Sequence, residues 1–193
     1  MFIIRRYVVF GLILIGFFIL AGCSEQKQTS EVDPQKVLSP IELQAFEKIN
    51  DYRRDKGLQP LAVDERIINQ ARIHSRNMGN GVTPFGHEGF NERVNASGVN
   101  FKTAAENVAY NQGYNDPAAN AVEGWIKSEG HRKNIEGDYN LTGMGVFQND
   151  SGRYYFTQLF MKTDGDTNNI APNQPQNKGR DPLQDFFSQF KFW

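Results

Sequence analysis

Among the side chains that can hold a metal ion or move a proton, three have a sequence setting that suits a site: His87, Glu106 and His131. His87 lies in a segment rich in glycine, proline and aromatic residues, and His131 follows closely after a predicted helix. Glu106 has small or apolar neighbours on both sides, which indicates burial, and a buried carboxylate needs a partner or a shifted pKa. Two imidazoles and one carboxylate form a zinc set that leaves one position open for water or ligand.

The remaining histidine has a different setting. His74 falls on the same helical face as the apolar residues Ile67, Ala71 and Met78. We therefore interpret His74 as a satisfied, partly buried core residue. His87 and His131 are both predicted to lie in loops, where side chains are free to face a binding site.

Three predicted helices must position these side chains. Ser39 begins the first with a capping box, and Gly57 is placed to end it. A second helix begins at Asp64, and a third begins at Asp116, which is followed by proline. The segment 101–110 is predicted to be a short helix or a loop.

After the third predicted helix the spacing of apolar residues changes from a helical pattern to one typical of strands. Residues 143–147 and 154–160 are predicted to be strands, joined by a four-residue turn that ends in Gly152. Helices come first and an antiparallel hairpin comes last, which favours an α+β domain. The predicted domain spans residues 39–162.

The N-terminus has the pattern of an export signal. Arg5 and Arg6 precede an apolar run over 7–20, which has about the length of a signal core and is short for a membrane span. The run ends in Leu-Ala-Gly-Cys, an order that resembles the bacterial lipobox. We therefore predict that residues 1–22 are a lipoprotein signal peptide. Cys23 would then carry the lipid and palmitate chain and anchor the exported protein to the outer face of a bacterial membrane.

The cysteine content excludes an intramolecular disulfide, and the charge argues against a nucleic-acid partner. Cys23 is the one cysteine in 193 residues, so no intramolecular disulfide can form. Without residues 1–22 the chain has 19 basic and 22 acidic residues, a formal net charge of −3. A chain with this balance lacks the excess positive charge that is typical of nucleic-acid-binding proteins. Residues 23–38 are predicted to be a polar tether, and 163–193 a polar linker followed by an aromatic C-terminal tail.

Taken together, several short motifs resemble the CAP superfamily (cysteine-rich secretory proteins, antigen 5, pathogenesis-related 1), also called the SCP domain. They are similar to the exported bacterial branch and occur in that family's order. The motifs are Asn50-Asp51-Tyr52-Arg53, Gly57-Leu58-Gln59-Pro60-Leu61, Gly86-His87, Ala105-Glu106-Asn107-Val108-Ala109, Trp125 to Ile135, Gly143-Met144-Gly145-Val146 and Tyr155 to Phe160.

The resemblance implies a three-layer α-β-α sandwich with a small antiparallel sheet between helices. It also implies a central cavity lined by two histidines and two acidic residues, which holds a divalent metal in some members. By position, His87, Glu106 and His131 are the cavity and metal residues. Where animal and plant members have a second glutamate, this sequence has Ser128, followed by Glu129. Serine is a poor zinc ligand, so any metal is expected to be held more weakly or completed by water.

Three functions remain open from the sequence. The favoured one is a surface-tethered binding module, without established catalysis. Its cavity would bind a divalent metal, zinc by preference, or a small molecule, and its outer groove a lipid, peptide or cell-wall glycan. The second is a metal-assisted hydrolase that acts on a cell-envelope or extracellular substrate, with Glu129 as general base. The third is a purely structural hydrogen-bond network of His87, Glu106 and His131.

Overall fold

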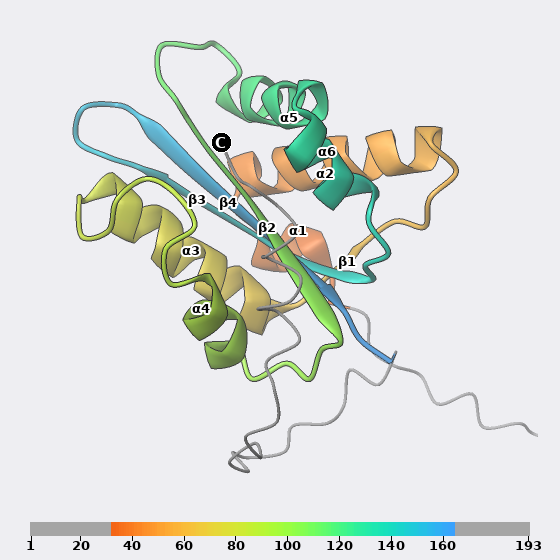
Figure 1. Cartoon of the computed structure of the whole chain (residues 1–193). Helices are drawn as coiled ribbons and strands as arrows, with labels where there is room; N and C mark the ends of the chain where they lie inside the picture. Colours follow the sequence, from red (N-terminus) through yellow and green to blue (C-terminus); the bar gives the residue numbers. More distant parts are fainter. Residues whose placement is uncertain (1–31, 165–193) are drawn as a thin grey trace, which may run out of the picture.

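The computed structural model of the chain describes residues 32–164 (Figure 1). The helices are α1 (Pro34–Val37), α2 (Pro40–Asp55), α3 (Glu65–Gly79), α4 (Phe90–Ala96), α5 (Pro117–Lys127) and α6 (Glu129–Glu136). The strands are β1 (Ala62–Val63), β2 (Thr103–Asn111), β3 (Leu141–Gln148) and β4 (Tyr154–Lys162).

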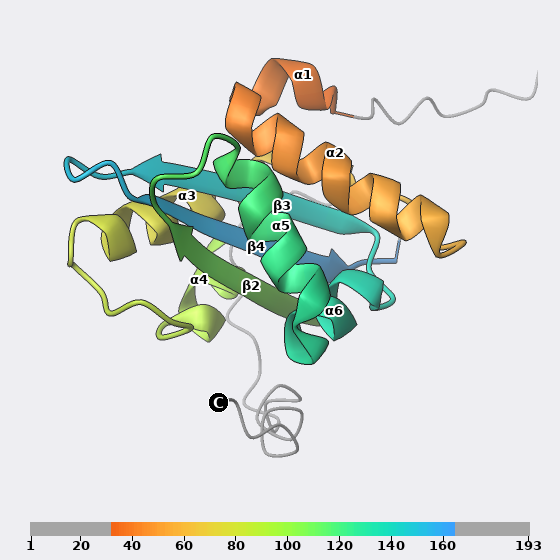
Figure 2. The same ribbon diagram turned by 90° about the horizontal axis from the view of Figure 1, so that it is seen from above.

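One four-stranded sheet, in the order β1-β3-β4-β2, lies between two helical layers. Helices α3 and α4 pack together, with α3 lying on β3 and β4, whereas α2, α5 and α6 cover the other face (Figures 1 and 2). The predicted α+β class and three-layer sandwich are confirmed. The sheet is mixed rather than purely antiparallel, because β1 pairs with β3 in the parallel direction.

The layer of α3 lies unusually close to the sheet because β3 contributes two glycines at the contact. A β-carbon on Gly143 would overlap the backbone of Ile67 and Ile68, and one on Gly145 would overlap the backbone of Ala71 and Arg72. Glycine at these two positions lets the helix backbone approach the strand directly. This close approach fixes α3, and with it His74, against the middle of the sheet.

Strand β2 is an edge strand, and side chains from α5 and α6 cover part of its outer rim. The indole Nε1 of Trp125 donates to the main-chain oxygen of Val108 at 3.0 Å, and Asn134 Nδ2 donates to that of Glu106 at 3.1 Å. Alternate residues of an edge strand direct their carbonyls outward, where they need a partner. These two bonds hold the α5–α6 layer at the level of Glu106.

Three predicted helices and the hairpin are confirmed. The first is capped as expected, since the Ser39 backbone N–H donates to Glu42 Oε2 at 2.8 Å, and Gly57 follows its end with a φ of 71°. The prediction for 101–110 is wrong, because 103–111 forms the strand β2. The loop prediction for His131 is also wrong, since this residue lies within α6.

Part of the segment predicted to be a polar tether is structured. Residues 34–37 form α1, and Leu38 is 7% exposed within the core. Arg72 Nη2 donates to the main-chain oxygen of Val37 at 2.8 Å, which joins this segment to α3. The predicted signal peptide, Cys23 and the predicted C-terminal tail beyond 164 lie outside the described residues. Within 32–164, no helix is both long and apolar enough to cross a membrane.

Candidate functional site

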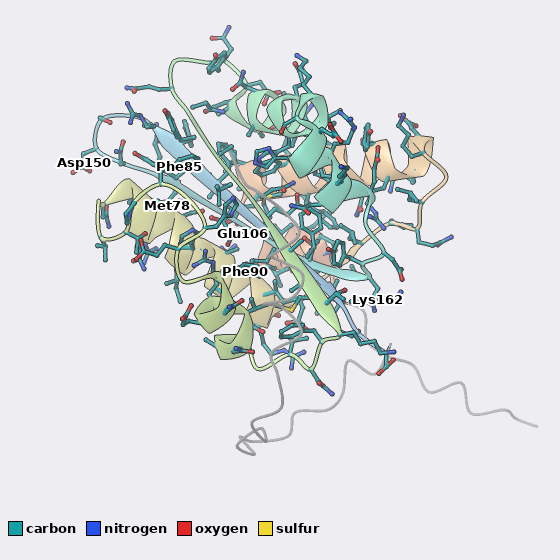
Figure 3. All side chains as sticks on the ribbon, in the orientation of Figure 1. Met78, Phe85, Phe90, Glu106, Asp150 and Lys162 are labelled. Carbon is teal, nitrogen blue, oxygen red and sulfur yellow. The ribbon has the colours of Figure 1, made fainter. Side chains whose placement is uncertain are left out.

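Glu106 is a buried carboxylate held by an arginine of α4. Its side chain is 2% exposed and lies on the α3–α4 side of β2, as do Met78 and Phe90 (Figure 3). Arg93 Nε donates to Glu106 Oε2 at 2.6 Å, and Arg93 Nη2 donates to Oε1 at 2.9 Å. The pair is bidentate, which is the strongest arrangement for guanidinium and carboxylate.

Glu106 also orients His87. The Nδ1 atom of His87 lies 2.9 Å from Glu106 Oε1, and the imidazole is 40% exposed. Arg93 fixes the backbone of the same loop by donating to the main-chain oxygens of His87 and Glu88, at 3.1 and 2.8 Å. Gly89, with a φ of 74°, makes the tight turn from this loop into α4. One arginine therefore holds both the carboxylate and the loop that carries the imidazole.

His131 is held from the opposite helical layer. It lies at the third position of α6, and its Nδ1 is 2.9 Å from the Oγ of Ser128, the residue that precedes the helix. Its main-chain oxygen accepts from Asn107 Nδ2 at 3.1 Å, which ties α6 to β2. We call the group His87, Arg93, Glu106, Ser128 and His131 the β2-edge site, because hydrogen bonds connect these residues to β2 at Glu106 and Asn107.

The charges of this site are coupled. Burial raises the pKa of Glu106, but hydrogen bonds from His87 and Arg93 outweigh it and hold that pKa below its ordinary value. Burial lowers the pKa of His131, and the charge of His87 lowers it further. The imidazole of His131 is therefore neutral at pH 7, which is the form that binds metals.

The structure does not assemble His87, Glu106 and His131 as three metal ligands. Across residues 32–164, no three His, Cys, Asp or Glu side chains are grouped so that they can hold a metal ion. Both oxygens of Glu106 are already engaged by Arg93, so this carboxylate fits the role of orienting His87 rather than of a direct ligand. Two imidazoles then remain as the residues that fit a cation.

Ser128, at the position where the resemblance implies a second glutamate, and its neighbour Glu129 differ in their placement. Ser128 contacts His131 and belongs to the site. Glu129 does not join it, because its side chain is 71% exposed and pairs with Lys133 one turn along α6. A residue at the first position of a helix and its neighbour four positions on share one surface, which favours this pairing over an inward turn.

Sequence reasoning missed Arg93 and Asn134. Arg93 is 8% exposed, and an arginine next to Glu92 in a polar helix gives no sign of burial by itself. The predicted burial of Glu106 was the signal that could have indicated Arg93, since a buried carboxylate needs a cation nearby. Asn134 donates to both the Glu106 main-chain oxygen and Asn107 Oδ1, a bridge that depends on the packing of α6.

Comparison with known proteins settles the family. The family model described as "Cysteine-rich secretory protein family", CAP, matches residues 46–160. The chain belongs to the CAP family. The match begins within α2 and ends within β4, so it includes every residue of the β2-edge site. This CAP domain therefore contains the site as part of the family fold rather than as an added segment.

Two proteins of Bacillus subtilis (strain 168) are similar to this CAP chain. "Uncharacterized protein YkwD" is 33% identical over 144 residues, and "Uncharacterized membrane protein YlbC" is 36% identical over 142 residues. The matches cover 72% and 70% of the chain, but 54% and 38% of the two relatives. The chain thus spans about half or less of the curated relatives it matches.

Solved structures support the same CAP fold. An extracellular protein containing a SCP domain from Bacillus anthracis str. Ames is 28% identical, with a TM-score of 0.56, over 68% of this chain and 44% of that one. An outer surface protein from Borrelia burgdorferi is 18% identical, with a TM-score of 0.55, over 68% and 96% of the two chains. These neighbours are extracellular or surface proteins.

Proposed function

We propose that this chain is an exported, lipid-anchored CAP protein whose β2-edge site binds a divalent cation between His87 and His131. The observation that carries this proposal is that two imidazoles, one from each helical layer, are each held at Nδ1 by a dedicated side chain. Glu106 holds His87 at 2.9 Å, and Ser128 holds His131 at 2.9 Å. Imidazoles held in this way are typical of ligands positioned for a cation.

A bound divalent cation would supply positive charge that attracts an anionic or carbonyl oxygen of a small ligand. His87 and His131 would bind it, and water or that ligand would complete the coordination. With two protein ligands instead of the three of open zinc sites, the affinity is expected to be modest. Arg93 and Glu106 would act behind His87 by fixing the orientation of its ring.

Zinc binding itself separates this proposal from the purely structural network. Both imidazoles must be neutral to bind a cation, so calorimetric titration with zinc should report a saturable binding heat at pH 7.5 and weaker binding at pH 5.5. The same titration of the variant His131→Ala should lose that heat. Absence of any saturable zinc heat at pH 7.5 would leave the structural network as the better account.

Export and lipid attachment are the second part of the proposal. The lipobox at Cys23 supports them, as does the extracellular description of the similar Bacillus anthracis protein. Two acyl chains make membrane attachment stable where one chain is marginal. Wild-type protein made in a bacterium should partition into the detergent phase, and the variant Cys23→Ala should remain in the aqueous phase. Identical partitioning of the two would remove the lipid anchor from the account.

Hydrolysis has less support. The general base expected from the sequence, Glu129, is exposed and paired with Lys133. Ser128 and His131 lie within hydrogen-bond distance, but Glu129 is not placed to act as the acid of a serine triad. A binding function therefore agrees better with the placement of these side chains.

A further inference from the structure

The α3–α4 layer has a pocket that shares Arg93 with the β2-edge site, but neither His87 nor His131 lines it. This pocket of about 290 Å³ opens between α3, α4 and the loop that joins them. Arg93 forms the wall between this pocket and Glu106. Its polar lining is Gln70, His74, Asn77, Thr83, Glu88 and Glu92.

His74 lines this pocket, and one ring nitrogen has no hydrogen bond to any described residue. The residue is 3% exposed, and its Nε2 lies 2.8 Å from the main-chain oxygen of Gly86. A carbonyl only accepts hydrogen bonds, so Nε2 must carry the proton and donate it. Burial lowers the pKa of His74, which keeps the ring neutral near pH 7. Nδ1 is then an unprotonated acceptor, and it makes no hydrogen bond within residues 32–164.

The other polar groups of the pocket add acceptors and negative charge. Thr83 Oγ1 is buried and has no hydrogen-bond partner among the described residues. Glu88 and Glu92 contribute two carboxylates at the exposed rim. The one cationic lining residue, Arg93, is neutralised by its bidentate pair with Glu106, and its remaining donor contacts are to main-chain oxygens. The lining therefore favours a ligand that is positively charged and rich in N–H donors.

We propose that this pocket binds a small organic cation through a primary ammonium group. The ammonium has three donors, which can satisfy His74 Nδ1 and Thr83 Oγ1 while its charge is attracted to Glu88 and Glu92. The volume suits a ligand of a few heavy atoms beyond the ammonium group.

Nuclear magnetic resonance can test this proposal on the full-length chain in detergent. The chain has three histidines, so the ring nitrogens of His74 can be resolved in a ¹⁵N spectrum. We expect n-butylammonium to shift His74 Nδ1 and the Thr83 amide saturably. Neutral 1-butanol lacks the charge and tetramethylammonium lacks the N–H donors, so each should bind at least about tenfold more weakly.

Matched variants test the charge contribution without disturbing the core. The double variant Glu88→Gln with Glu92→Gln changes two exposed side chains, and it should weaken butylammonium binding by about tenfold. Glu47→Gln is the control, an exposed carboxylate on α2 in the other layer, and it should bind as wild type does. The proposal is overturned if 1-butanol or tetramethylammonium matches butylammonium, if the double variant binds equally well, or if no saturable shift occurs. None of these outcomes depends on zinc binding at His131.

Discussion

Arg93 and Glu106 form a bidentate pair in which the guanidinium is 2.6 Å from one carboxylate oxygen and 2.9 Å from the other. The pair is almost completely enclosed, with side-chain exposures of 9% and 2%. Because the same guanidinium binds the backbone of His87 and Glu88, it joins the buried charge to the loop of the site. The stability of the fold and the position of His87 thus depend on one contact.

Removal of the guanidinium should therefore be costly. The variant Arg93→Met leaves Glu106 buried without its cation, and we expect a loss of about 3–5 kcal/mol in the free energy of unfolding. Urea unfolding followed by circular dichroism measures this. The control is Arg54→Met, which breaks an exposed pair with Asp51 and should change stability by no more than about 0.5 kcal/mol. Equal losses for both variants would show that the Arg93 pair is not special.

The same pair predicts how stability depends on acid. The pKa of Glu106 is lowered in the folded protein from its ordinary 4.5, so the unfolded state binds a proton first as the pH falls. The stability that Glu106 contributes is fully present above about pH 4.5 and is lost as the pH falls through the folded-state pKa. The variant Glu106→Gln should be less stable at pH 7 and should lose less stability from pH 4.5 to 3. A curve parallel to wild type over that interval would contradict this assignment.

The features that the sequence predicted are those with local signals. The capping box at Ser39, the proline after Asp116 and the change of period before β3 are each readable from a few residues. Strand β2 was missed because residues 104–108 are buried on both faces, which removes the alternation that marks a half-exposed strand. Helix α6 was missed because Ile135 is its single buried residue, which leaves no apolar face to detect.

The site was predicted in part for a related reason. His87, Glu106 and His131 stood out because their side chains are chemically distinctive and match the family's order. Arg93 was missed because nothing local distinguishes a buried arginine from a solvated one. The placement of Glu129 depends on the angle at which α6 leaves Ser128, which only the packing of α6 against β2 determines.

Variants of Trp125 test how α5 packs along the outer edge of β2. The side chain is 2% exposed, packs in the main core, and donates to the Val108 carbonyl at 3.0 Å. We expect Trp125→Ala to cost about 3–5 kcal/mol through the cavity that it leaves. Trp125→Phe keeps most of the apolar contact but leaves the carbonyl without a donor, at a cost of about 1–3 kcal/mol. Unfolding curves measure the stability losses of both variants. Tyr114→Ala is the control, because Tyr114 is 55% exposed and its loss should hardly change the stability.

The most direct test of the proposed function is the melting temperature at pH 7.5 with and without zinc, for wild type, His131→Ala and Glu129→Gln. A cation that binds the folded state raises the midpoint according to its concentration over the dissociation constant. Wild type and Glu129→Gln should both gain in zinc, because Glu129 is exposed and paired with Lys133. His131→Ala should not gain, and the wild-type gain should shrink at pH 5.5 as protons compete for the imidazoles. A wild-type midpoint unmoved by zinc at pH 7.5, or an equal rise in His131→Ala, would contradict the cation site.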